Sequence, residues 1–236
     1  MIKKKAILGV LITSMIGLNS SIDNAMTTDT IETKEKVKEN GTTVDLIQSN
    51  YQINQEQNKL AQERLENKKY ELLEFISSTY KNINMDIINC AFNSAKNRVP
   101  NASEDEYNTM VALHLAVMEV ETGFTPNTIG YNSTTMDYGI MQVNETAIEH
   151  AQKYLNNYSL NEFVLADNVE IGSAIIYQCY EQAIEKHPNE NTIWWMYAYY
   201  NRGLYFENYS WNFAEANARS NKFIQKYNSY YNILNK

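Results

Sequence analysis

The sequence predicts a mainly α-helical protein, and the first observation behind this prediction is the scarcity of glycine and proline. The 236 residues include only 8 Gly and 3 Pro, whereas dinucleotide-binding sheet folds and collagen need these residues at many fixed positions. The second observation is that segments of helix-forming composition recur from residue 45 onward. With 44% hydrophobic residues, the chain can form one ordinary globular core and an extension.

The first 25 residues have the charged, apolar and polar order of a secretory signal. Three lysines precede an apolar run at residues 6–18, which is shorter than the roughly 20 residues of a membrane-spanning helix. Cleavage after residue 25 is therefore expected. Because Asp23 stands where cleavage sites favour a small residue, an uncleaved form tethered to the membrane through residues 6–18 stays an alternative. In both cases the protein is expected to be exported, to the cell wall or the extracellular space.

Residues 26–84 are expected to form a linker and a helical spacer. The segment 26–44 is rich in Thr, Lys and Glu and has too few large apolar groups to order itself. From 45 to 82, Gln, Glu, Lys, Asn and Leu dominate without Gly or Pro, which favours a helix. An apolar residue recurs every seventh position from Leu46 to Leu60, but the repeat fails at Asn67, so a long coiled coil is not expected.

Residues 85–236 have the pattern of a single helical domain. A first helix is expected at 85–98. A second is expected at 103–122, with a capping box of Ser103 and Glu106 at its start and Gly123 as its stop. The Asn-, Thr- and Gly-rich segment 125–136 is typical of a surface loop. Further helices are expected at 145–154, 169–186, 192–200 and 211–227.

The composition also limits the partners and the chemistry. The chain has 20 Lys and Arg against 28 Asp and Glu, a net charge of −8, which excludes the clustered basic surface of a nucleic-acid-binding protein. Cys90 and Cys179 are the only cysteines; outside the cytosol they can pair, or both can be small buried apolar groups. Neither stands in a CxxC motif or beside a His, so no metal and no redox chemistry is expected.

Glu121 is the first candidate for chemistry, because it falls in the last turn of the expected 103–122 helix, beside the apolar face. A helix C-terminus and desolvation both disfavour a carboxylate, so its pKa is expected to be raised. A carboxyl group protonated near neutral pH suits the general acid of glycoside cleavage. By periodicity alone, an ordinary surface glutamate is the simpler interpretation. Glu119 lies about 200° away around the helix and is expected to be solvated.

Four motifs follow one another from Glu121 onward. Residues 121–126 read E-T-G-F-T-P, and residues 139–142 read G-I-M-Q. Residues 168–172 read N-V-E-I-G, and residues 199–203 read Y-Y-N-R-G. In this order the motifs resemble those of the lytic transglycosylase family of lysozyme-like proteins, which are E-S-G-F-x-P, G-L-M-Q, N-I-x-x-G and A-Y-N-x-G. The resemblance spans about residues 87–231.

The resemblance implies a lysozyme-like helical domain with a short β-like flap around residues 133–144 and a groove for the glycan strands of peptidoglycan. It implies Glu121 as the catalytic acid of a lytic transglycosylase, with no metal and no cofactor. It also implies that Tyr200 orients Glu121. Substrate contacts are implied for Ser133, Met141, Gln142, Tyr200 and Asn201. Of the aromatic residues at 194–211, most are expected to pack in the core, and sugar stacking is the alternative.

Asp137 keeps further alternatives open. Residues 137–144 read DYGIMQVN, which is similar to animal-type lysozymes and to the transglycosylases of conjugation and secretion machines. In those lysozymes this Asp is the second catalytic carboxylate, so a hydrolytic muramidase using Glu121 and Asp137 is one alternative. A turn-forming role for Asp137 is another. A non-catalytic wall-binding or assembly protein is the third function class, and secretion or conjugation machinery is an expected partner. The oligomeric state is not predicted.

Overall fold

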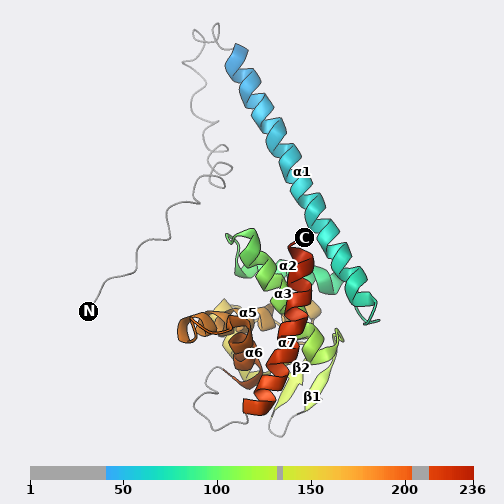
Figure 1. The fold of residues 1–236 in the computed structure, drawn as a ribbon, viewed down its shortest axis with the longest axis vertical. Helices are drawn as coiled ribbons and strands as arrows, with labels where there is room; N and C mark the ends of the chain where they lie inside the picture. The colour runs from blue at the N-terminus through green and yellow to red at the C-terminus, as the bar shows by residue number, and fades with distance from the viewer. Residues whose placement is uncertain (1–40, 132–134, 204–212) are drawn as a thin grey trace, which may run out of the picture. The chain divides into compact units, whose positions relative to one another are not determined.

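The prediction of a mainly α-helical protein is confirmed by the computed structural model, which describes residues 41–131, 135–203 and 213–236 (Figure 1). In these residues three short strands form one antiparallel sheet in the order β1-β2-β3. The elements are α1 (Gly41–Ser77), α2 (Met85–Arg98), α3 (Glu104–Thr122), β1 (Ile129–Tyr131), β2 (Met136–Tyr138), β3 (Val143–Asn144), α4 (Glu145–Leu155), α5 (Leu165–Lys186), α6 (Thr192–Arg202) and α7 (Phe213–Leu234).

Helix α3 is the element around which the domain packs. Every residue from Asn108 to Glu119 is buried, and a helix that is apolar and buried on all sides belongs at the centre of a domain. Helices α2, α5 and α7 all contact α3, and α6 contacts α5 and α7 (Figure 1). The apolar face predicted from the sequence is therefore only part of the buried surface of this helix.

The local signals at the ends of α2 and α3 act as predicted. Ser103 caps α3 by accepting from the backbone N–H of Glu106, and the side chain of Glu106 accepts from the N–H of Ser103 in return. Gly123 ends the helix in the left-handed conformation with φ 57°. At α2, Asn84 accepts from the N–H of Ile87 at 3.1 Å.

The small sheet occupies most of the predicted flap and begins earlier than expected. Strand β1 lies in the segment 125–136, which the sequence pattern assigned to a loop. Three residues are too short for a periodic signal, and the strand forms because β2 pairs with it, with Gly130 opposite Asp137. Asp137 in turn pairs with Asn144 of β3.

Contacts divide the chain into two units, Met1–Ala61 and Gln62–Lys236, and the boundary falls within α1. In the first unit, the side chains of residues 51–60 are exposed. In the second unit, Leu72 and Ile76 are buried. Residues 62–84, which the sequence analysis places in the spacer, thus contribute to the core of the second unit, because apolar residues here fall on one side of the helix.

The N-terminal predictions lie outside the described residues. These are the signal at residues 1–25, the tether at 6–18 and the first part of the linker. Helix α1 begins at Gly41, a few residues before the expected start of the spacer helix. Among the residues that the structure describes, no helix has the length and apolar character needed to cross a membrane.

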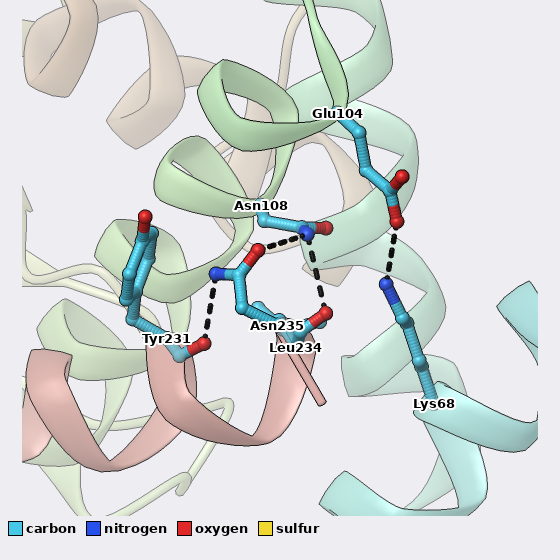
Figure 2. Close-up of polar contacts among 6 residues, drawn as sticks. All are labelled: Lys68, Glu104, Asn108, Tyr231, Leu234 and Asn235. Carbon is cyan, nitrogen blue, oxygen red and sulfur yellow. Dashed lines mark hydrogen bonds and ion pairs between the residues drawn. The ribbon is translucent and has the colours of Figure 1, made fainter.

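A buried asparagine fastens the C-terminal end of α7 to α3 (Figure 2). Nδ2 of Asn108 donates to the backbone oxygen of Leu234 at 3.2 Å and to Oδ1 of Asn235 at 3.0 Å. The last carbonyls of a helix have no partner within the helix, so this bond satisfies one of them. On the same side, Lys68 of α1 pairs with Glu104 at the start of α3 at 2.8 Å. The first turns of α3 thus hold parts of both α1 and α7.

The two cysteines are free thiols, so of the two alternatives the structure favours the unpaired one. Cys179 is buried in α5 and Cys90 is half-buried in α2. Burial raises the pKa of both thiols, which makes them poor nucleophiles.

His114 lies in the middle of α3 and is fully buried. Its Nδ1 is 3.1 Å from the backbone oxygen of Ala91, so the ring carries its proton on Nδ1 and donates to that carbonyl. Burial lowers the pKa of His114 from 6.5 to about 4, and the charge of Arg98 contributes. The imidazole is therefore neutral at pH 7.

We expect His114 to make the protein less stable as the pH falls from 7 to 4. From pH 7 to pH 4 the unfolded chain protonates His114 almost fully, whereas the folded chain reaches only about half protonation at pH 4. The free energy of unfolding therefore decreases by about 3 kcal/mol from this group. Urea unfolding at pH 7 and pH 4 measures the effect. Between these two pH values, the free energy of unfolding of His114→Gln should decrease by about 3 kcal/mol less than that of the wild type. His150→Gln, at an exposed site, is the matched control and should behave as the wild type. Equal pH dependence in His114→Gln would contradict this prediction.

Candidate active site

Glu121 lies in the last turn of α3 and is half-buried. The hydroxyl of Tyr197, from α6, donates to its Oε1 at 2.9 Å. Burial raises the pKa of Glu121 above its ordinary value, the direction that the sequence predicts. The Tyr197 hydrogen bond and the charge of Arg219 oppose this shift, whereas the charge of Asp137 adds to it. The carboxyl group is therefore placed in surroundings that suit a group which both gives and takes a proton.

The chain turns sharply after this helix through two residues in the left-handed conformation. Gly123 has φ 57° and Phe124 has φ 63°. The N–H of Gly123 donates to the backbone oxygen of Glu119 at 3.0 Å. A residue other than glycine costs roughly 1–2 kcal/mol in this conformation, and the full burial of the Phe124 ring offsets that cost. The turn that carries Glu121 thus depends on packing for its shape.

Thr122, which replaces the Ser of the E-S-G-F motif, fastens this turn to the sheet. Its Oγ1 lies 3.1 Å from the backbone oxygen of Met118 and 3.2 Å from that of Ile140, so it can donate to either. The same oxygen accepts from the N–H of Thr125 at 3.3 Å. A Ser hydroxyl could make the same contacts, which explains why the substitution is tolerated.

The G-I-M-Q and N-V-x-x-G motifs interlock around Asn168, which is buried. Its Oδ1 accepts from the N–H of Met141 at 3.0 Å, and its Nδ2 donates to the backbone oxygen of Tyr138 at 3.0 Å. A Cβ at Gly139 would lie 2.3 Å from Nδ2 of Asn168, and a Cβ at Gly172 would lie 2.7 Å from Cε of Met141. Both glycines are therefore required for α5 to approach the sheet closely.

Met141 and Gln142 are both engaged by the protein itself. The side chain of Met141, for which the resemblance implies a substrate contact, is fully buried against Gly172 in the structure. The Nε2 of Gln142 donates to the backbone oxygens of Thr128 at 3.2 Å and Gly139 at 2.8 Å. The amide N–H groups of Gln142 therefore tie β1 to the turn after β2.

The hydrogen bond to Glu121 comes from Tyr197, whereas the orienting role implied for Tyr200 stays a prediction. The Tyr200 hydroxyl donates to the backbone oxygen of Met141 at 2.6 Å, so it holds the flap against α6. Burial raises the pKa of Tyr200, and the charge of Glu121 contributes to this, so the two groups are neighbours. Tyr197 lies one helical turn before Tyr200 on the same face of α6. That spacing is the signal that could have identified Tyr197, which the sequence analysis left among the core aromatics.

Asp137 lies within strand β2 and is half-buried. It pairs with strands on both sides, so the alternative of a turn residue does not describe its position. Its negative charge raises the pKa of Glu121 and of Tyr200, which places it within electrostatic range of both. The charge of Asp137 thus acts on Glu121, the other candidate carboxylate.

Glu119 is buried, and the prediction that it is solvated is wrong. Only 4% of its side chain is exposed. The hydroxyls of Tyr80 and Tyr230 donate to its two carboxylate oxygens, and Lys226 forms an ion pair with it. The side of α3 opposite Glu121 is covered by α7 and by the segment after α1. Neither neighbour can be recognised from the pattern of α3 itself.

The remaining predicted residues are placed as follows. Ser133 lies outside the described residues, as do the aromatic residues 205, 209 and 211. Asn201 is half-buried in the last turn of α6. Tyr199 is fully buried, as expected for core packing, and Trp195 stacks on His187 with 3.5 Å between ring centroids. Across residues 41–131, 135–203 and 213–236, no group of three or more His, Cys, Asp or Glu side chains is placed to hold a metal ion.

Comparison with known proteins gives one match. The family model of the transglycosylase SLT domain matches residues 98–225, which include Glu121 and all four motifs. No curated protein and no solved structure matches the chain.

We expect Glu121→Gln to stabilise the protein increasingly as the pH rises from 4 to 8. The folded state binds the proton of Glu121 more tightly than the unfolded chain, so the wild type loses stability as the pH rises above the ordinary pKa, and the amide does not. The gain is about 1.4 kcal/mol for each unit by which burial raises the pKa. Urea unfolding at pH 4, 6 and 8 measures it.

The matched control is Glu149→Gln, the same change at an exposed site on α4. Its stability difference from the wild type should show no such rise with pH. If Glu121→Gln followed this control at every pH, Glu121 would not have a raised pKa.

Proposed function

Because the chain belongs to the transglycosylase SLT domain family, whose members cleave peptidoglycan, we propose that it is a lytic transglycosylase. Its substrate would be the β-1,4 bond between N-acetylmuramic acid and N-acetylglucosamine in glycan strands. Its product would be a strand that ends in 1,6-anhydro-N-acetylmuramic acid. The observation that carries this proposal is the half-buried Glu121 with its raised pKa, in the motif position where the family has its acid.

In the first step Glu121 gives its proton to the oxygen of the glycosidic bond. The bond from this oxygen to C1 of the muramoyl sugar breaks, and N-acetylglucosamine leaves as a neutral alcohol. The N-acetyl group of the muramoyl residue stabilises the cationic sugar. In the second step the C6 hydroxyl of the same sugar attacks C1, and its proton returns to Glu121. The two steps as written need no water, no metal ion and no covalent enzyme intermediate.

The surroundings of Glu121 support both steps. Burial favours the protonated form that the first step needs. The Tyr197 hydroxyl and the charge of Arg219 stabilise the carboxylate that exists between the two steps. The hydroxyl keeps its own proton, because burial and the charge of Glu121 raise the pKa of Tyr197. Tyr197 can therefore donate to Glu121 in both states.

A hydrolytic muramidase is the second candidate, and the position of Asp137 favours it. Asp137 lies near enough for its charge to act on Glu121, as the second carboxylate of a glycosidase must. In this reaction Asp137 would activate water or trap the sugar, and the product would carry a reducing end. The lyase needs only one carboxylate and the groups of the substrate.

We also propose that the enzyme works outside the cytosol, where peptidoglycan lies. Residues 1–25 would direct export, with cleavage of this segment or with a membrane tether through residues 6–18. The resemblance of residues 137–144 to enzymes of conjugation and secretion machines makes such a machine the proposed partner. Helix α1, with its exposed residues 51–60, would then act as a spacer between membrane and wall.

Glu121→Gln should lower the rate of wall lysis by at least about 100-fold, because the amide keeps the shape but cannot donate and retrieve a proton. Release of soluble fragments from purified peptidoglycan measures the rate. Glu149→Gln is the matched control and should lyse walls at the wild-type rate. Undiminished lysis by Glu121→Gln would remove Glu121 from the chemistry.

The products should carry 1,6-anhydro ends, and digestion in ¹⁸O-labelled water should leave them unlabelled. Mass spectrometry of the released muropeptides measures both. Asp137→Ala should retain activity, reduced by the loss of its contacts in the sheet, and give the same products. Labelled reducing ends, together with an Asp137→Ala variant as inactive as Glu121→Gln, would instead establish the muramidase.

A further inference from the structure

The segment that follows α1 contacts the turn at the end of α3. The ring of Tyr80 lies edge-on to the ring of Phe124, with 5.4 Å between centroids. A Cβ at Gly123 would lie 3.1 Å from the same ring, so Tyr80 covers Gly123 closely. Asn82 Nδ2 donates to Oγ1 of Thr125 at 3.1 Å. Tyr80 therefore packs against Gly123 and Phe124, the two residues of this turn with a left-handed backbone conformation.

Tyr80, Glu119, Lys226 and Tyr230 form a second set of contacts, which we call the Glu119 cluster. Tyr80 donates to Oε1 of Glu119 at 2.8 Å, Tyr230 donates to Oε2, and Lys226 pairs with Oε1. Burial and the charge of Glu119 raise the pKa of Tyr80 to about 12, so its hydroxyl keeps its proton and donates. A buried carboxylate with three donors is fixed in position, because each lost donor leaves charge without a partner.

The Glu119 cluster and Tyr197 hold opposite sides of the same helical turn. Glu119 and Glu121 are two residues apart, which places their side chains about 200° apart around α3. The last turn of a helix lacks part of its backbone hydrogen bonds and frays readily. A rotation of this turn would move Glu121 away from the Tyr197 hydroxyl. The direction of Glu121 therefore depends on what holds Glu119.

Three members of the Glu119 cluster lie outside the residues that the family model matches. The family model matches residues 98–225, whereas Tyr80 precedes it and Lys226 and Tyr230 follow it. The segments that flank the family domain thus reach its catalytic turn. They do so on the side of α3 opposite Glu121, so they act on Glu121 through the backbone of α3.

We propose that Tyr80 and Glu119 are positioning residues, which hold the last turn of α3 so that Glu121 faces Tyr197 and the substrate. This proposal rests on the proposed function, because it assigns Glu121 the proton transfer. It predicts that loss of the Tyr80 hydroxyl slows the reaction without weakening substrate binding, since neither residue lies on the side of α3 that carries Glu121.

The first test compares Tyr80→Phe with Tyr107→Phe. Both tyrosines are half-buried, and each donates one hydrogen bond, Tyr107 to the backbone oxygen of Phe92 at 3.1 Å. Tyr107 lies in the first turn of α3, far from Glu121 along the helix. With soluble glycan strands as substrate, Tyr80→Phe should lower kcat about tenfold and leave KM within about twofold. Tyr107→Phe should leave both within about twofold of the wild type.

Glu119→Gln is the second variant, because it keeps the size of the side chain and loses the ion pair with Lys226. It should also lower kcat at unchanged KM. Wild-type kcat in both Tyr80→Phe and Glu119→Gln would overturn the proposal, provided that Glu121→Gln is inactive in the same assay. A decrease in kcat of the same size in Tyr107→Phe would also overturn the proposal, because a general loss of protein stability would then explain both variants.

The second test does not need activity. Hydrogen exchange of the backbone amides of Gly123 and Phe124 reports opening of the turn, because both donate to carbonyls of α3. In Tyr80→Phe, the exchange rates of these two amides should increase by more than the decrease in global stability accounts for. In Tyr107→Phe, any increase should be no larger than the decrease in global stability accounts for. Unchanged exchange in Tyr80→Phe would overturn the positioning role. A wild type that cleaves no glycan would refute the proposed function, while the exchange result would still decide whether Tyr80 holds the turn.

Discussion

The arrangement around Glu121 depends on the burial of α3 on all sides. Because neighbours enclose this helix as far as its last turn, a carboxylate there must find partners or retain its proton. Glu119 is paired with Lys226 and two tyrosine hydroxyls. Among the described residues, Glu121 accepts from the Tyr197 hydroxyl, and burial raises its pKa. Two residues apart on one helix, the two carboxyl groups thus have different surroundings.

The flap is held to the helices mainly through its backbone. Thr122, Asn168 and Tyr200 come from three different helices, and each bonds a backbone atom between residues 138 and 141. Such bonds fix the course of the chain whatever side chains the flap carries. This explains why motif residues far apart in the sequence meet at one place.

Local signals could predict much of the fold and the position of Glu121. The capping box of Ser103 and the stop at Gly123 depend on neighbouring residues, so they are readable from the sequence. The environment of Glu119 was not predictable, because α7 and the segment after α1 cover it from distant parts of the chain. Tyr197 was missed for a related reason: as an aromatic in a cluster it resembles a core residue, and only the placement of α6 brings its hydroxyl to Glu121.

The Glu119 cluster also bears on where the functional domain begins and ends. Residues 98–225 match the family, yet the donors to Glu119 lie outside this range at Tyr80, Lys226 and Tyr230. A fragment cut at the limits of the match would lose Tyr80, Lys226 and Tyr230, which both pair with Glu119 and cover it. The Glu119 carboxylate would then lie in water without fixed partners, and the turn that carries Glu121 would lose this anchor. The unit that has to fold to fix the position of Glu121 is therefore closer to residues 62–236, which the contacts delimit, than to the segment that the family model matches.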